Sequence, residues 1–218
     1  MRINYLTAVN KVLTRMRENT AITVDENNYS ALIGEFVNDA KEHVENAWDW
    51  SSLRDTAIIN TIAGEYQYTL VGLDERATMV DSLNVTTKSF LRFQGTHWFQ
   101  RQLALADPDA VGPPQYFGPN SLDSSGWSIV DVFPVPDGVY QLNFNVIYRR
   151  EPLAKDTDIL YLPSKPVILR AFAKALSERG EQGGQSALEA FAEAEQVLAD
   201  AIALDAYRHP EELMYRVP

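Results

Sequence analysis

Apolar residues recur every three or four positions near both ends of the chain, and this spacing puts them on one face of a helix. The pattern runs through residues 3–18, 28–48, 164–179 and 186–207. Ser164 is placed to cap the third of these helices, because its hydroxyl can accept a hydrogen bond from a first-turn N–H. The sequence therefore predicts two helices in the N-terminal part of the chain and two in the C-terminal part.

Between these helical segments the pattern changes to an alternation of apolar and polar positions, which is typical of β-strands. Residues 56–62 and 66–70 predict one hairpin, because the turn-forming sequence Ala-Gly-Glu lies between them. Residues 127–136 and 138–150 predict a second hairpin around a Pro-Asp-Gly turn. Both turns are short, so we expect each to join two neighbouring strands of one sheet.

Further short elements are predicted between these two hairpins. Residues 77–87 and 89–94 form a third strand pair, and a short helix follows over residues 96–105. Residues 106–126 are dense in Pro, Gly, Asp and Ser and predict a loop, with one short strand at residues 115–117. The middle of the chain is therefore expected to be an antiparallel sheet or small sandwich.

This order of helices, strands and helices predicts an α+β fold. We expect a helical bundle formed by the N- and C-terminal helices, with an antiparallel β domain inserted into it. The helical domain takes residues 1–54 and 153–218, the second of which includes a C-terminal tail. The β domain takes residues 55–152.

Large aromatic residues are concentrated at two places in this scheme. Trp48 and Trp50 lie where the second helix gives way to the first strand, and Trp98 and Phe99 lie in the short middle helix. Aromatic side chains fill seams between packed parts of a protein and are enriched at interfaces between subunits. These four residues are therefore our first candidates for a subunit or partner interface.

Charge narrows the classes of partner. The chain of 218 residues has a formal net charge of −11, which makes broad attraction to nucleic acid unfavourable. From residue 181 to the end there are eight acids and two bases, whereas residues 82–106 contain no acid.

Cysteine is absent, basic residues interrupt the apolar positions of residues 1–19, and no run approaches about 20 apolar residues. We expect a protein made in a reducing cytoplasm that binds no membrane.

Residues that could support catalysis or metal binding do not form a recognisable pattern. The three histidines, His43, His97 and His209, lack the helical spacing of a zinc site, and the Asp-rich segment 107–118 ends in glycine where a calcium loop needs a carboxylate. The glycines of residues 180–186 do not fit a phosphate loop, and no Gly-x-Ser-x-Gly motif occurs. A pair of catalytic carboxylates has no local motif, because the two acids come from distant positions in the sequence. We expect no metal, no cofactor and no enzyme activity.

The segment of residues 88–101 has two interpretations, because its three cations are interleaved with aromatic residues. Such a pattern can stack bases or sugars. It can also pack a short helix onto a sheet or a neighbouring chain, which we favour. A carbohydrate-binding module that stacks sugars on Trp98 or Trp127 is the alternative from a different class of function.

Several segments together resemble the phage adaptor proteins of the head-to-tail connector, a group that includes tail tubular protein A of short-tailed phages. They are AWDWSSLRDTAIINTIAGEYQYTL, GPPQYFGPN, VDVFPVPDGVYQLNFNVIYRREPL, DTDILYLPSKPVILRAFAKAL and the final Ala/Glu-rich helix. The resemblance covers residues 28–207.

The resemblance implies a structural virion protein that assembles as a ring, usually of twelve copies, beneath the portal protein. The helical part would face the portal and neighbouring copies, the β part would meet the tail nozzle or other tail proteins, and DNA would pass through the lumen. An acidic lining would suit a channel that DNA must not stick to. A head-completion or tail-terminator protein of the neck is the alternative within this class.

The C-terminal tail is a further candidate contact. Residues 207–218 would order on a neighbouring copy or on the portal, through Tyr207, Arg208, Tyr215 and Arg216. A frayed chain end would give the same sequence pattern.

Overall fold

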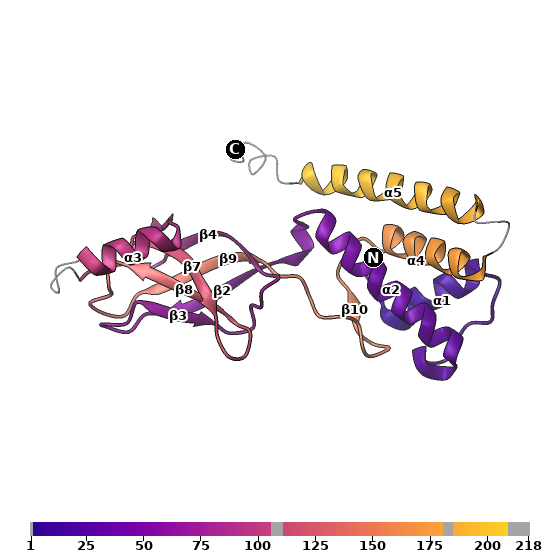
Figure 1. Ribbon diagram of the computed structural model, residues 1–218, viewed down its shortest axis with the longest axis horizontal. Coiled ribbons are helices and arrows are strands. Elements are labelled where there is room, and N and C mark those ends of the chain that lie inside the picture. The colour runs from indigo at the N-terminus through magenta and orange to yellow at the C-terminus, as the bar shows by residue number, and fades with distance from the viewer. Residues whose placement is uncertain (1, 106–110, 181–184, 209–218) are drawn as a thin grey trace. The chain divides into compact units, whose positions relative to one another are not determined.

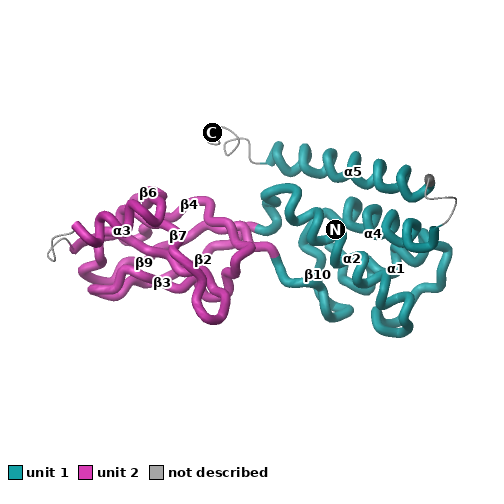
Figure 2. The backbone as a smooth tube through the Cα atoms, in the orientation of Figure 1, with its two compact units in different colours: residues 1–53, 150–218 teal, residues 54–149 magenta. Residues whose placement is uncertain are grey.

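The computed structural model describes residues 2–105, 111–180 and 185–208, and Figure 1 shows its helices and strands. The chain forms two compact units (Figure 2). Unit 1 contains residues 1–53 and 150–218, and unit 2 contains residues 54–149. The helices of unit 1 come from both ends of the chain and the strands of unit 2 from its middle, so the prediction of an α+β fold is confirmed.

Four α-helices make up most of unit 1. They are α1 (Tyr5–Arg15), α2 (Asn28–Ala47), α4 (Ser164–Arg179) and α5 (Gln185–Ala206). Helix α4 packs against each of the other three, and α5 lies on the outside of α4 (Figure 1). Two short 3₁₀ helices, Val24–Glu26 and Ser51–Leu53, flank α2, and strand β1 (Ile3–Asn4) pairs with β10 (Ile159–Leu160).

The helix ends follow capping rules, with one exception. The Asn4 side chain accepts from the Thr7 N–H, and Asn27 and Ser30 form a reciprocal capping box at the start of α2. The prediction that Ser164 caps α4 is wrong, because Ser164 is already the first helical residue and the capping position is occupied by Pro163. Helix α4 ends at Gly180, whose φ of 64° is a conformation that glycine adopts without strain.

Close packing of α1 on α2 depends on Gly34. A Cβ atom built on this glycine would lie 2.5 Å from the Tyr5 hydroxyl and 2.8 Å from a Val24 methyl. The buried Tyr5 side chain therefore occupies the space that a larger residue would need. Burial raises the pKa of Tyr5 to about 12, so the hydroxyl stays protonated and can accept the long hydrogen bond from Asn38 Nδ2, at 3.4 Å.

Unit 2 is a sandwich of two four-stranded sheets. The first sheet has the order β2 (Arg54–Asn60), β9 (Gln141–Ile147), β4 (Thr78–Asn84) and β5 (Ser89–Phe90). The second has the order β3 (Gln67–Leu70), β8 (Ser128–Phe133), β7 (Tyr116–Leu122) and β6 (Arg92–Phe93). One buried cluster joins the inner faces, with Val130 and Val132 from β8 and Leu142 and Phe144 from β9.

Both predicted hairpins are wrong in their pairing. Strand β2 pairs with β9 and β3 with β8, so each of the two short turns carries the chain from one sheet to the other. The physical reason is burial: β8 and β9 both have one apolar face, and placing the strands in opposite sheets lets these faces cover each other. The predicted pairing of β4 with β5 is confirmed, whereas β6 pairs with β7 in parallel and departs from the antiparallel prediction.

Helix α3 (Thr96–Leu105) follows the predicted range and covers the outer face of the second sheet at Gly118. A Cβ atom on Gly118 would lie 2.2 Å from the Gln94 carbonyl oxygen and 2.7 Å from the Phe99 ring. The absence of a side chain at this position therefore lets the start of α3 approach the sheet closely. Among the described elements of unit 2, α3 is the only α-helix and it packs on the second sheet, so within this unit the outer face of the first sheet carries no helix.

Candidate functional site

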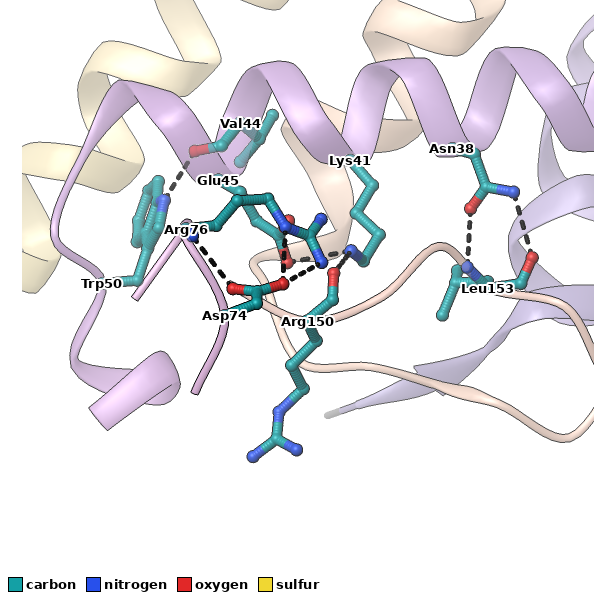
Figure 3. Close-up of polar contacts among 9 residues, drawn as sticks. All are labelled: Asn38, Lys41, Val44, Glu45, Trp50, Asp74, Arg76, Arg150 and Leu153. Carbon is teal, nitrogen blue, oxygen red and sulfur yellow. Dashed lines mark hydrogen bonds and ion pairs between the residues drawn. The ribbon is translucent and has the colours of Figure 1, made fainter. Parts of the chain in front are cut away.

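The end of α2 shows what the first aromatic pair does. Trp50 is 1% exposed, and its indole N–H donates to the Val44 carbonyl at 2.6 Å, which satisfies one of the last carbonyls of the helix (Figure 3). Trp48 is half-buried and caps α2 with an extended backbone. Trp50 thus fills the interior of its own unit, whereas Trp48 keeps surface that another molecule can reach.

A buried polar cluster on α2 holds the chain where it returns from unit 2. Lys41 Nζ lies 3.0 Å from a Glu45 carboxylate oxygen and donates to the Arg150 carbonyl at 2.7 Å (Figure 3). Asn38 clamps Leu153 by two bonds, donating to its carbonyl at 3.0 Å and accepting from its N–H at 2.9 Å. Because Lys41 and Glu45 are 5% and 2% exposed, water contributes little to stabilising these charges, and the pair stabilises both.

The second aromatic pair lies between α3 and the sheet below it. Phe99 is 1% exposed, and the half-buried Trp98 packs against three rings. The ring centroids are 4.7 Å away for Tyr116, 5.1 Å for Phe99 and 5.6 Å for Phe133. This packing anchors α3, and it occupies surface of Trp98 that a stacked sugar would need. Trp127, the other residue named for sugar stacking, is half-buried.

The basic aromatic edge is an exposed segment of unit 2 defined by Lys88, Phe90, Arg92 and Phe93. At Leu91, which is buried, the chain crosses from β5 in one sheet to β6 in the other, so the edge runs along one side of the sandwich. Phe90 is 70% exposed and Phe93 62% exposed, and both basic side chains are exposed as well. Two exposed phenylalanines beside two exposed cations that form no ion pair with another described residue mark a candidate contact surface.

The outer face of the first sheet differs from the basic aromatic edge, because its polar side chains form hydrogen bonds with one another across the strands. Thr56 Oγ1 donates to Asn145 Oδ1 at 3.0 Å, and Asn145 Nδ2 donates to Asp81 Oδ1 at 2.6 Å. These groups have protein partners already, so the face has less to gain from a binding partner than the edge has.

Helix α5 presents a second candidate surface, which we call the outer face of α5. Its opposite side packs on α4 through buried Ala187, Ala194 and Leu198. The outer face is exposed and combines acids with apolar residues: Leu188, Glu189, Ala192, Glu193, Ala199, Asp200, Ala203 and Leu204. Leu188 and Leu204 are 71% and 70% exposed. No Lys or Arg occurs in Gln185–Ala206. The helix is therefore apolar on one side and both apolar and acidic on the other.

Polar contacts fix the position of α5 within unit 1 at two places. Glu195 forms an ion pair with Arg170, and one of its carboxylate oxygens lies 3.4 Å from His43 Nε2. Asp205 accepts from the Ser51 N–H and hydroxyl at 2.9 and 2.6 Å. Burial is the main cause that lowers the pKa of His43 below 6.5, so this side chain is neutral at pH 7.

A cleft of about 730 Å³ lies between the end of α1, α4 and the start of α5. Its charged groups include Arg179, which pairs with Glu18 at 2.5 Å and lies 5.0 Å above the Tyr29 ring. Arg15 and Arg17 at the end of α1 also line the cleft, as do Glu189 and Glu193 of α5. A search of the described ranges finds no group of three residues suited to hold a metal ion. Among the described helices, none has both the length and the apolar character needed to cross a membrane.

The residues predicted as interface candidates come from both compact units. Trp48 and Trp50 belong to unit 1, and Trp98 and Phe99 belong to unit 2. Tyr207, 84% exposed, and exposed Arg208 follow the end of α5. Tyr215 and Arg216 lie outside the described residues. An interface role for these residues stays a prediction, and Trp50 and Phe99 also have a clear role inside the subunit.

Sequence reasoning did not find the Lys41 cluster or the apolar component of α5. The Lys41–Glu45 spacing of four residues is also that of an ordinary exposed helix pair, and nothing in it indicates burial. Alanine favours a helix at buried and exposed positions alike, so the sequence does not show which alanines of α5 are exposed. The packing of α5 on one side shows it.

The sequence matches one known protein family over nearly its whole length. Residues 3–214 match the family described as SU10 adaptor protein, so the match includes both compact units. No curated protein matches the sequence significantly. The family match spans all of the described helices and strands of the two units, including both candidate surfaces. The chain therefore belongs to the SU10 adaptor protein family, a family of phage head-to-tail adaptors.

Proposed function

We propose that this structural protein of the phage neck assembles as a closed ring between the portal protein and the tail, and that DNA passes through the ring's lumen. The observation that carries the proposal is the family match over residues 3–214, since it includes both units of the chain. An adaptor needs one surface for each neighbour along the virion axis, and a chain with two compact units can supply two such surfaces.

A ring of identical subunits requires two different surfaces on each copy that fit each other and close. The outer face of α5 and the basic aromatic edge supply exposed apolar side chains of the kind that such contacts bury. The accessible parts of half-buried Trp48 and Trp98, together with exposed Tyr207 and Arg208, would contribute to contacts with neighbouring copies, the portal or tail proteins. Tyr215 and Arg216 would continue the contact made by the tail.

The charge of the chain supports passage of DNA. A net charge of −11 per copy gives a ring a strongly negative field, and a lumen that repels phosphates lets DNA slide without binding. The function requires no catalysis and no cofactor, and we propose that the protein acts through assembly alone.

The test is the mass of the purified protein, alone and mixed with its cognate portal protein, measured by light scattering behind a sizing column. We expect the portal to shift to a larger complex with a fixed number of bound copies that saturates on titration. A protein that stays monomeric and never joins the portal contradicts the proposal. An unrelated acidic protein of similar size serves as the control for charge-driven association.

A further inference from the structure

We infer that the basic aromatic edge of one copy docks on the outer face of α5 of a second copy. This inference rests on the proposed function, and it names the pair of surfaces that closes the ring. The occupant of the outer face of α5 is thus a second copy of this chain.

Charge complementarity is the first argument. Glu189, Glu193 and Asp200 lie exposed on α5, and none of them forms an ion pair with another described residue, although Glu189 and Glu193 also line the cleft that contains Arg179. Lys88 and Arg92 lie exposed on the edge and likewise lack an ion pair within the described part of the chain. The edge lies in a segment without acids, and α5 is a helix without bases. The edge of one copy therefore attracts α5 of another copy.

The spacing of the charges also fits. Glu193 and Asp200 are seven residues apart on a helix, which is about 10 Å along its axis. Lys88 and Arg92 are four residues apart in a mostly extended chain, which is at most about 14 Å. Because Lys and Arg side chains are long and flexible, the two cations can meet the two acids at the same time.

Apolar surface is the second argument, and it distinguishes this pairing from simple charge attraction. The edge exposes two phenylalanines, Phe90 and Phe93, and α5 exposes Leu188, Leu204 and the alanines between them. Small alanines on a helix let a flat aromatic ring approach closely, and burial of both rings would supply a hydrophobic centre with a rim of charged pairs.

The two surfaces differ from each other, so the contact is heterologous. Each copy would use its edge on one neighbour and its α5 on the other neighbour, which generates a ring when the rotation closes. The same chain therefore carries both halves of one interface, and a single substitution in either half affects every contact of the ring.

The first test uses the absence of cysteine in the natural chain. We would prepare Ser89→Cys at the edge and Ala199→Cys on α5 as separate proteins, mix them with portal protein, and add a bismaleimide with a short spacer. Because the two cysteines are on different copies, every linked dimer reports an intermolecular contact. Val71→Cys, at a site 78% exposed elsewhere in unit 2, replaces Ser89→Cys in the control mixture.

We expect the Ser89→Cys and Ala199→Cys mixture to give at least about tenfold more linked dimer than the control mixture and than either protein alone. Equal yields in the test and control mixtures would overturn the inference. If the portal complex still forms in that case, the proposed function stands and only the interface is wrong. If the natural protein never joins the portal, the proposed function and the inference both fail.

A second test exchanges the charges. Arg92→Glu and Asp200→Lys are each expected to weaken portal-dependent assembly by at least about tenfold, because each puts like charges opposite each other. The double variant carries the pair with reversed signs and is expected to recover most of the loss. A double variant whose loss is the sum of the two single losses would overturn the inference. Circular dichroism of each exposed-site variant checks that the fold is intact.

Discussion

Replacing Lys41 with Met removes the cation of a buried ion pair on α2. In the native structure Lys41 Nζ lies 3.0 Å from Glu45 and donates to the Arg150 carbonyl at 2.7 Å. Met fills nearly the same volume, so the change tests the polar contacts and not the packing. The segment after Arg150 would lose one of the bonds that hold it to α2.

The expected loss in the free energy of unfolding is about 3–5 kcal/mol, because removing one partner of a buried ion pair is strongly destabilising. The size follows from burial: both side chains are at most 6% exposed, so water does not replace the lost partner.

The assay is urea denaturation followed by circular dichroism at 222 nm, which reports mainly the helices of unit 1. With a slope of about 2 kcal/mol per molar urea, the single variant lowers the midpoint by about 1.5–2.5 M. Lys174→Met is the matched control, because Lys174 pairs with a partly exposed Asp39 at 2.5 Å, and such pairs contribute at most about 1 kcal/mol. Equal midpoints for the two variants would refute the reasoning.

Three further substitutions or titrations test other parts of the structure. Gly118→Ala would place a Cβ 2.2 Å from the Gln94 carbonyl, so we expect a loss of about 1–3 kcal/mol in urea denaturation, whereas Gly138→Ala, with open space around its Cβ, should be close to neutral. Trp50→Phe removes the buried indole N–H and leaves a helix carbonyl without its donor, so we expect a loss of about 1–3 kcal/mol by circular dichroism, and an unchanged midpoint would contradict this. His43 should titrate below pH 6.5 in an NMR experiment. Because the pKa of His43 is lower in the folded state, the unfolded chain binds the proton more readily. The contribution of His43 to stability is therefore fully present above pH 6.5 and is lost as the pH falls below that value. A measured pKa of His43 at or above 6.5 would contradict that account.

The helices were predictable from sequence because their signal is local. Apolar residues spaced three and four apart report burial of one face, and the observed ranges Asn28–Ala47 and Ser164–Arg179 agree closely with the predicted ones. The acidic character of the last helix was also visible. Its second apolar face was not, because alanine is compatible with both a buried and an exposed helix position.

The strand partners were not predictable, because pairing depends on the whole sandwich. A short Pro-Asp-Gly turn between two alternating segments is a strong hairpin signal, yet β8 and β9 lie in different sheets. The signal describes only the turn, whereas the choice of sheet follows from where Val130 and Phe144 can bury their side chains together. The polar cluster was missed for a similar reason, since Lys41 and Arg150 are far apart in the sequence.

The central claim is that this adaptor closes into a ring on the portal, and electron microscopy of the portal complex tests it most directly. We predict a closed ring of density coaxial with the portal, with an open channel through both and α5 of each copy in contact with its neighbour. Portal particles without added density, or copies bound singly without contact between them, would contradict the account.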